Sequence, residues 1–258
     1  GYEVTVFEKH EKPGGLLRLG IPNFKLGKNV IDRRIHLLEE EGIIFRTGIC
    51  VGKDISAREL IDQFDAVCLA IGAEVPRDLP VEGRSLRGVH FALDLLANQN
   101  RLLEGIPVPE EARISCQGKR VLVIGGGDTG SDCVGTANRH HAAQVTQIEI
   151  MPKPPVGYNP ATPWPMYPQV LKTSSSHEEG CVRRWNLATN RFMGENGVVK
   201  GVEVEEVEWI LAEGGGRPQM HKTGRKEIIE ADLVFLAMGF VHPVQEGLLT
   251  ELALSVDG

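Results

Sequence analysis

A glycine-rich segment between a predicted strand and a predicted helix constrains this chain most strongly. The apolar run Lys119–Ile124 leads into G-G-G-D-T-G, which holds the pattern G-x-G-x-x-G at Gly125, Gly127 and Gly130. The helix is expected over Asp128–His140, so the pattern has the context that a dinucleotide-binding loop requires. The first glycine permits the tight turn, the second lets a pyrophosphate approach the backbone, and the third lets helix and strand pack closely. The N–H groups at the helix start then attract the phosphates.

The strand after this helix bears on which nicotinamide cofactor would bind. An acid directly after it would accept hydrogen bonds from ribose hydroxyls and favour NAD. We expect this strand over Val145–Met151, which places Glu149 inside the strand and leaves no acid after it. Lys153 is then available to a 2′-phosphate, with Arg139 as a second cationic candidate, and this arrangement favours NADP. An ordinary solvated loop lysine is the alternative for Lys153.

One pattern occurs twice in the chain. D-x-V-x-L-A-x-G fits both Asp65–Gly72 and Asp232–Gly239. Each copy is an apolar run suited to a strand buried on both faces, and each ends in a glycine, where a backbone can approach a ligand closely. The repeat predicts two similar nucleotide-binding units, against the alternative that two core strands are alike by chance.

The first residues predict a second dinucleotide site. Residues 2–9 read as a short buried strand with Glu8 near its end, where an acid can hold an adenosine ribose. Such an acid lies about 20 residues after a glycine loop, whereas the sequence starts only seven residues before Glu8. We therefore expect an internal fragment whose second dinucleotide-binding unit lacks its phosphate loop. The turn at Gly14–Gly15 resembles one that flavoproteins often place beside the dinucleotide, which favours a flavin role for Glu8 over that of a merely solvent-facing acid.

The remaining elements follow from hydrophobic periodicity and turn residues. The sequence predicts helices over 27–42, 56–63 and 91–103, and strands over 43–51 and 65–72. It also predicts a β-meander over 180–210, a turn at 214–216 and a buried strand over 232–239.

Composition argues against several classes of function. The chain has 258 residues, a net charge of −7 and no basic run, so no nucleic-acid partner is expected. No apolar stretch would span a membrane and no signal peptide is recognisable, so we expect a cytoplasmic protein. The five cysteines form no C-x-x-C pair and are expected to be reduced thiols rather than a metal site or a disulfide framework.

Two further segments carry weaker functional signals. Residues 173–179 combine hydroxyls with a histidine, but no third orienting group or oxyanion site is visible, so a capped turn is favoured over a nucleophile. The proline-rich loop 157–168 holds aromatic residues and is either a lid or partner surface or a stiff connection.

Several motifs occur in a fixed order along the chain. They are E-K at 8–9, P-G-G-L-L-R at 13–18, G-I-P-N-F-K-L at 20–26, V-I-D-R-R at 30–34, G-G-G-D-T-G-S-D-C at 125–133 and T-S-S-S-H-E-E-G at 173–180. In this order, and over nearly the whole chain, they resemble the small (β) subunits of NADPH-dependent glutamate synthase. The resemblance implies an α/β fold with two nested Rossmann-like dinucleotide-binding domains of the flavin/NADPH disulfide-reductase kind, the flavin one incomplete.

The resemblance also implies a function. In that family NADPH passes a hydride to FAD, and electrons continue through iron–sulfur clusters to a large subunit that forms glutamate. Carried over by position, the residues implied to lie at FAD are Glu8, Gly15, Leu16, Lys25, Val51, Ala70 and Gly72. Those implied to face NADPH, besides Gly125, are Gly126, Gly127, Asp128, Thr129, Lys153, Ala237, Met238 and Gly239. No acid–base residue is implied, because the cofactors do the hydride chemistry.

The sequence departs from the family at both ends. The family's cysteine-rich N-terminal domain for iron–sulfur clusters, its first flavin loop and its C-terminal flavin motif are not found. We therefore expect a partial FAD-binding domain at 1–75, an NADPH-binding domain with a β-meander at 76–240 and a return segment at 241–258. The fragment alone is expected to be inactive, and its exposed apolar sheet surface would favour oligomerisation.

Two alternative functions remain open at this point. The first is a related electron-transfer subunit of the NADPH:ferredoxin or dihydropyrimidine-dehydrogenase kind, with another electron acceptor. The second is a non-catalytic NADP(H)-binding module.

Overall fold

The computed structural model describes residues 1–166, 168–210 and 218–256. The chain folds as two compact units, a smaller one of Gly1–Arg77 with Gly239–Gly258 and a larger one of Asp78–Met238. Each unit is described below by itself.

The larger unit is built on a five-stranded sheet in which every neighbouring pair is parallel. The strand order is β4-β11-β5-β6-β7. Parallel neighbours need a crossover connection, and α5 (Asp128–Arg139) connects β5 to β6. The strand bounds are β4 Val89–Phe91, β5 Arg120–Ile124, β6 Gln144–Ile148, β7 Val182–Arg184 and β11 Leu233–Leu236.

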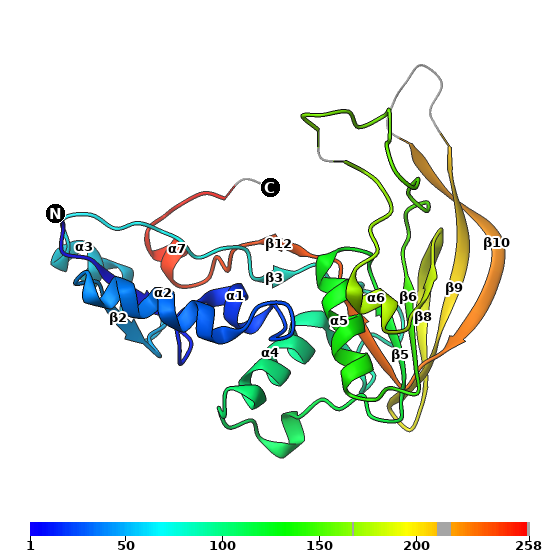
Figure 1. Cartoon of the computed structure of the whole chain (residues 1–258), viewed down its shortest axis with the longest axis horizontal. Coiled ribbons are helices and arrows are strands. Elements are labelled where there is room, and N and C mark those ends of the chain that lie inside the picture. The colour runs from blue at the N-terminus through cyan, green and yellow to red at the C-terminus, as the bar shows by residue number, and fades with distance from the viewer. Residues whose placement is uncertain (167, 211–217, 257–258) are drawn as a thin grey trace. The chain divides into compact units, whose positions relative to one another are not determined.

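Both faces of this sheet are buried. Alternate side chains of a strand point to opposite faces. Val121 and Val123 of β5 join the core that includes α4 (Ala92–Leu103) and α5, whereas Leu122 and Ile124 join a second core with β8 (Leu187–Glu195) and β9 (Val198–Ile210). Figure 1 shows the helices on one side of the sheet and the antiparallel strands on the other. The carboxyl ends of the parallel strands therefore meet at one edge of a sheet whose two faces are both covered.

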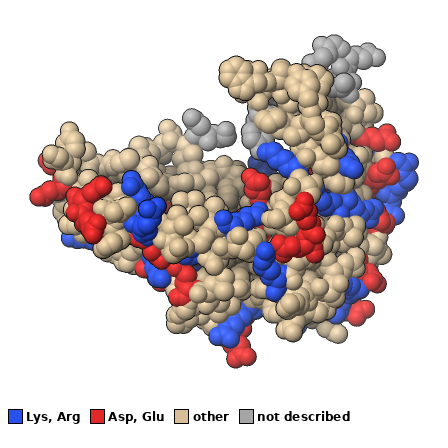
Figure 2. Space-filling model, viewed as in Figure 1, with Lys and Arg blue, Asp and Glu red and all other residues tan. Residues whose placement is uncertain are grey.

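The covering strands form the antiparallel sheet β10-β9-β8, in which β10 spans Gln219–Glu230. Ion pairs join β9 to β10, among them Arg225 with Glu206 and Lys226 with Glu203. Figure 2 shows charges of both signs mixed along this part of the surface. The sequence reading did not include β10, because its side chains are mostly exposed and so show little apolar alternation. The short elements η1 (Glu110–Ala112) and α6 (Ser175–Glu178) complete the larger unit.

The described residues of the smaller unit, 1–77 and 239–256, form two short strand pairs and four helices. β1 (Thr5–Glu8) pairs in parallel with β2 (Ile44–Thr47), and β3 (Val75–Pro76) pairs antiparallel with β12 (Phe240–His242). The helices are α1 Gly15–Leu19, α2 Lys28–Glu40, α3 Ala57–Gln63 and α7 Leu248–Glu251.

Two buried cations hold the connection between α1 and α2. The Arg18 side chain is 2% exposed, and its Nε donates to the Pro13 carbonyl at 2.7 Å. The Lys28 ammonium donates to the carbonyls of Ile21, at 2.5 Å, and Leu17, at 3.1 Å. Hydrogen bonds to the backbone offset the cost of burying such groups.

The predicted buried strand at 65–72 is wrong. These residues form neither strand nor helix and are exposed, with Val67 39% and Leu69 37% exposed. An apolar run becomes a buried strand only where other elements cover it. In the described part of the chain β1 pairs only with β2, so the run at 65–72 has no neighbouring strand.

Several strand bounds also differ from the prediction. β2 covers only Ile44–Thr47 of the expected 43–51, β6 ends at Ile148 rather than Met151, and β11 covers only Leu233–Leu236 of the expected 232–239. The predicted turn at 214–216 lies outside the described residues. Among the described helices, none is both long and apolar enough to cross a lipid bilayer.

Candidate dinucleotide-binding site

The site predicted from the glycine pattern lies at the carboxyl edge of the parallel sheet. Gly125 follows β5, Glu149 follows β6, Trp185 follows β7 and Ala237 follows β11. The N–H of Ala237 donates to the carbonyl of Ile124 at 2.8 Å, which joins the ends of two adjacent strands. In open parallel sheets this edge is where nucleotides bind.

Two glycines of the loop are required by close backbone contact. Gly125 has φ 123°, and a Cβ atom there would lie 2.2 Å from the Ala237 carbonyl oxygen. A Cβ atom on Gly130 would lie 2.3 Å from the Gly125 carbonyl oxygen. These positions therefore perform the turn and the helix–strand packing that the pattern assigns to its first and third glycines.

The second glycine is different, because space lies beside it. A Cβ atom on Gly127 would have no atom within 4 Å, and the residue has an ordinary φ of −79°. Gly127 is the N-cap of α5, and no side chain caps this helix. The loop thus leaves room at the start of a helix, where backbone N–H groups and the helix dipole favour an anion. This open position fits the pyrophosphate of a dinucleotide.

Other predicted residues lie on the same edge. Asp128 and Thr129 begin α5 directly after the loop. Ala237 and Met238 follow β11, and the boundary between the two units falls between Met238 and Gly239. Gly239 has φ 80° and open space where a Cβ atom would lie.

The prediction that no acid follows the second strand is wrong. β6 ends at Ile148, so Glu149 is the first residue after the strand. Its Oε2 accepts the N–H of Gly126 at 2.6 Å, and its Oε1 accepts the N–H of Met151 at 3.2 Å. The strand was predicted too long because Ile150 and Met151 continue the apolar run, although both side chains are exposed.

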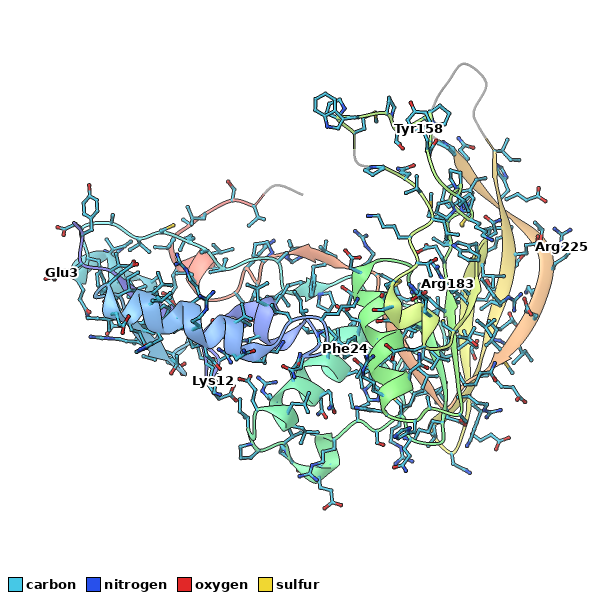
Figure 3. All side chains as sticks on the ribbon, in the orientation of Figure 1. Glu3, Lys12, Phe24, Tyr158, Arg183 and Arg225 are labelled. Carbon is cyan, nitrogen blue, oxygen red and sulfur yellow. The ribbon has the colours of Figure 1, made fainter. Side chains whose placement is uncertain are left out.

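The two cations proposed for a 2′-phosphate lie in different places. The Lys153 ammonium lies 5.1 Å from the centroid of the Trp185 ring, and the Arg183 guanidinium, labelled in Figure 3, lies at the same distance. Arg139 is the last residue of α5, about 16 Å from the loop at 1.5 Å per residue. It pairs there with Glu179 at 2.6 Å. Arg139 is therefore not part of the site.

A series of hydrogen-bonded polar side chains holds the carbonyl of Gly125 in the loop, and the sequence did not predict it. The buried Gln147 side chain donates through Nε2 to the Gly125 carbonyl at 2.8 Å. Its Oε1 lies 2.9 Å from Nε2 of His177. Nδ1 of His177 accepts the N–H of Ser174 at 3.1 Å, so Nε2 carries the proton and donates to Gln147. A glutamine inside a predicted core strand was the available signal, since buried amides need partners.

This chain of contacts decides between the alternatives for residues 173–179. Ser174 caps α6 in a capping box with His177, and its Oγ lies 2.5 Å from Oγ of Ser131 on α5. The segment is thus a capped turn packed on α5, as favoured, and the His177 ring supports the loop through Gln147.

The residues predicted for FAD all lie in the smaller unit. Glu8 ends β1, and its carboxylate accepts the N–H of His10 at 2.9 Å. Gly15 begins α1 with φ 49°, and Leu16, which follows it, is 45% exposed. Lys25 lies in the turn before α2, Val51 forms an isolated bridge with Ile55, and Ala70 and Gly72 lie in the exposed 65–72 segment. The role of these residues toward FAD stays a prediction.

The cysteines show no metal-binding arrangement. Within residues 1–166, 168–210 and 218–256, no group of three or more histidine, cysteine or acidic side chains could hold a metal ion. All five cysteines are free thiols, and burial raises the pKa of Cys116 to about 12. Cys116 and Cys133 belong to the core that also holds α4 and α5.

Comparison with known proteins agrees with this geometry. The chain belongs to the pyridine nucleotide-disulphide oxidoreductase family, whose model matches residues 31–258. The predicted α/β fold of the Rossmann kind is thereby confirmed.

Within this family, the chain is similar to glutamate synthase chains. It is 46% identical over 257 residues to the Mycobacterium tuberculosis (strain H37Rv) protein named glutamate synthase [NADPH] small chain, which covers 98% of this chain and 52% of that protein. It is 42% identical over 250 residues to the Saccharomyces cerevisiae protein named glutamate synthase [NADH], covering 94% of this chain and 12% of that protein. The resemblance seen in the motifs is therefore confirmed, and the chain spans about half the length of the small chains that it matches.

A solved structure shares the fold at low sequence identity. FprA of Mycobacterium tuberculosis, in complex with NADPH, superposes with a TM-score of 0.68 at 19% identity. The match covers 92% of this chain and 64% of that one.

Proposed function

We propose that this chain is the nicotinamide-binding part, with some of the flavin-binding part, of a glutamate synthase small chain. The whole protein would pass electrons from a reduced nicotinamide dinucleotide through FAD and iron–sulfur clusters to a large subunit that forms glutamate. The relatives' names supply glutamate as the product and the term small chain, the family resemblance of the motifs supplies the partner, and the site supplies the cofactor chemistry.

The open position beside Gly127 carries the proposal. A loop held by close contacts at Gly125 and Gly130, yet open at Gly127, is what a pyrophosphate requires. The dinucleotide would therefore lie across the carboxyl edge of the sheet, with its phosphates at the start of α5.

The remaining residues of the edge would orient the dinucleotide. Glu149 lies beside the loop on the β6 side, where the adenosine half would lie, and Ala237 lies on the β11 side. Gln147 and His177 would hold the Gly125 carbonyl in place. Nicotinamide donates a hydride and flavin accepts it, so the protein's contribution is to bind and to orient.

The flavin side of the proposal rests on position in the family pattern. Glu8 would hold the adenosine ribose of FAD, and Gly15, Leu16, Lys25, Val51, Ala70 and Gly72 would lie along the cofactor. The iron–sulfur clusters and the large subunit are proposed from the family resemblance of the motifs, and no described residue of this chain is assigned to them.

Flavin reduction in the whole protein tests the proposal. The protein made from its complete reading frame is purified, and NADPH or NADH is added without oxygen. Bleaching of the flavin absorbance, followed by glutamate formation once the large subunit, 2-oxoglutarate and glutamine are added, is the expected result. A protein that carries no flavin contradicts the proposal. Bleaching without glutamate formation would leave a reductase with another electron acceptor.

A further inference from the structure

The carboxylate of Glu149 is fixed at the edge of the nucleotide loop by contacts on both sides. Its two oxygens accept the N–H groups of Gly126 and Met151. Its own backbone is held by the end of β7 and the start of β8, because the Glu149 N–H donates to the Arg184 carbonyl at 2.9 Å, and the Leu187 N–H donates to the Glu149 carbonyl at 3.1 Å. This side chain is therefore placed by the fold and does not have to be ordered by a ligand.

The carboxylate keeps capacity for a further ligand. Two carboxylate oxygens offer about four lone-pair sites, and the hydrogen bonds to Gly126 and Met151 use two of them. The residue is only partly buried, so the remaining sites can be reached. It lies 23 residues after Gly126, close to the spacing of about 20 at which an acid meets the adenosine ribose.

A carboxylate at this position distinguishes a nucleotide with free ribose hydroxyls from one with a 2′-phosphate. A carboxylate accepts hydrogen bonds from the 2′ and 3′ hydroxyls of a ribose. A 2′-phosphate carries close to two negative charges at pH 7 and offers acceptors instead of a donor. Like charges held a few ångströms apart repel each other, and the hydrogen bond is lost as well.

In the described part of the chain, Lys153, Arg183 and Arg184 contact partners other than Glu149. Lys153 and Arg183 both lie against the Trp185 ring, and Arg183 donates to the Thr173 hydroxyl at 3.3 Å. Arg184 pairs with Glu227 on β10. The described contacts therefore direct each of these cations to a partner other than Glu149.

We infer that Glu149 selects the unphosphorylated adenosine ribose, so that this site prefers NADH to NADPH. The inference rests on the proposed function, and it replaces the preference that the sequence assigned to Lys153. Relatives named for NADPH and for NADH match the chain at similar identity, so sequence similarity does not decide which nucleotide this chain prefers.

Binding of two nucleotide fragments tests this inference without relying on hydride transfer. ADP-ribose and 2′-phospho-ADP-ribose are titrated calorimetrically into the protein made from its complete reading frame. We expect ADP-ribose to bind at least about tenfold tighter, which corresponds to about 1.4 kcal/mol. Glu149→Gln keeps an oxygen for the Gly126 N–H but removes the charge, and we expect it to lower this preference about tenfold.

The matched control is Glu195→Gln, which removes the same charge from an exposed residue at the end of β8 and should leave the preference unchanged. Equal or tighter binding of 2′-phospho-ADP-ribose by the wild type overturns the inference, and loss of that binding in Lys153→Ala would assign the choice to Lys153. A preference that survives Glu149→Gln overturns it as well. Failure of both fragments to bind would contradict the proposed function itself, whereas flavin bleaching by either nicotinamide nucleotide would leave that function standing.

Discussion

Residues 65–72 of the smaller unit and residues 232–239 of the larger unit carry the same pattern of side chains. In the larger unit Leu233–Leu236 pairs with β4 on one side and β5 on the other, and Val234 and Phe235 are fully buried. In the smaller unit the copy is exposed along its length. The difference shows that an apolar run alone does not make a strand, because the strands on either side supply the hydrogen bonds and the covered faces.

The aspartate that starts each copy shows the same contrast. Asp232 accepts three hydrogen bonds from Arg120, one from its backbone N–H and two from its guanidinium. These bonds lower the pKa of the Asp232 carboxyl to about 2. They tie the start of β11 to the start of β5, so they fix the register of the two strands whose ends form the nucleotide edge.

The largest expected effect concerns the buried side chains of the two copies. Phe235→Ala should lower the free energy of unfolding of the larger unit by about 3 to 5 kcal/mol, because it leaves a cavity between β11 and the helices. Leu69→Ala should cost less than about 1 kcal/mol, since Leu69 is 37% exposed.

Tryptophan fluorescence and far-ultraviolet circular dichroism during denaturant unfolding make this measurement together. Trp164, Trp185 and Trp209 all lie in the larger unit, so their fluorescence reports that unit, whereas helices of both units contribute to the circular dichroism. A Leu69→Ala protein whose circular-dichroism transition shifts as far as the transition of Phe235→Ala would show that the two copies are equally buried and would contradict the comparison.

The aspartates are expected to differ by a smaller amount. Asp232→Asn should destabilise the larger unit by about 1 to 2 kcal/mol at neutral pH, because a charge-assisted network is lost. Asp65→Asn is the matched control and should leave the transition unchanged within about 0.5 kcal/mol.

The pH dependence of the same pair follows from the lowered pKa. A carboxyl whose pKa falls from an ordinary value of 3.8 to about 2 on folding stabilises the folded state above pH 3.8. That contribution is lost as the pH falls toward 2. Unfolding curves should therefore converge for wild type and Asp232→Asn below about pH 2. A difference in unfolding free energy between wild type and Asp232→Asn that stays constant over this pH range would show that the Arg120 contact does not act through the charge of Asp232.

The smallest expected effect concerns the contact of His177 with Gln147, whose side chain holds the Gly125 carbonyl of the loop. His177→Ala leaves the buried Gln147 amide without one partner, so the Gly125 carbonyl is held less firmly. We expect nucleotide binding to weaken by about three- to tenfold, a change of roughly 1 kcal/mol. His221→Ala, on the exposed face of β10, is the control. If His177→Ala binds the nucleotide with wild-type affinity, the contact between His177 and Gln147 has only a structural role in α6.

Much of the larger unit could be predicted from the sequence, because its signals are local. The strand Arg120–Ile124, the glycine loop and α5 follow from a short apolar run and from the spacing of the glycines after it. β10 could not be predicted in this way, since its exposed side chains carry no alternation and its stability comes from pairing with β9.

The part of the site that depends on distant contacts was missed. Glu149 was misplaced because Ile150 and Met151 extend the apolar run beyond the true strand end. The partners of Gln147 come from residues far away in the chain, at Gly125 and His177. Such pairings are set by the packed sheet and by α6, and no local pattern encodes them.

Nucleotide binding by a Gly127→Val variant tests the central claim most directly. Gly127 has an extended, negative-φ backbone and open space beside it, so a valine should fold without strain while its methyl groups occupy the position proposed for the pyrophosphate. Calorimetric titration of the variant with NADH and with NADPH should show affinity at least about tenfold weaker than wild type for the better-bound nucleotide. The thermal unfolding midpoint should fall by no more than about 4 °C, because valine is a poorer N-cap than glycine. A variant that unfolds normally and binds both nucleotides with wild-type affinity would show that the dinucleotide does not bind at this loop.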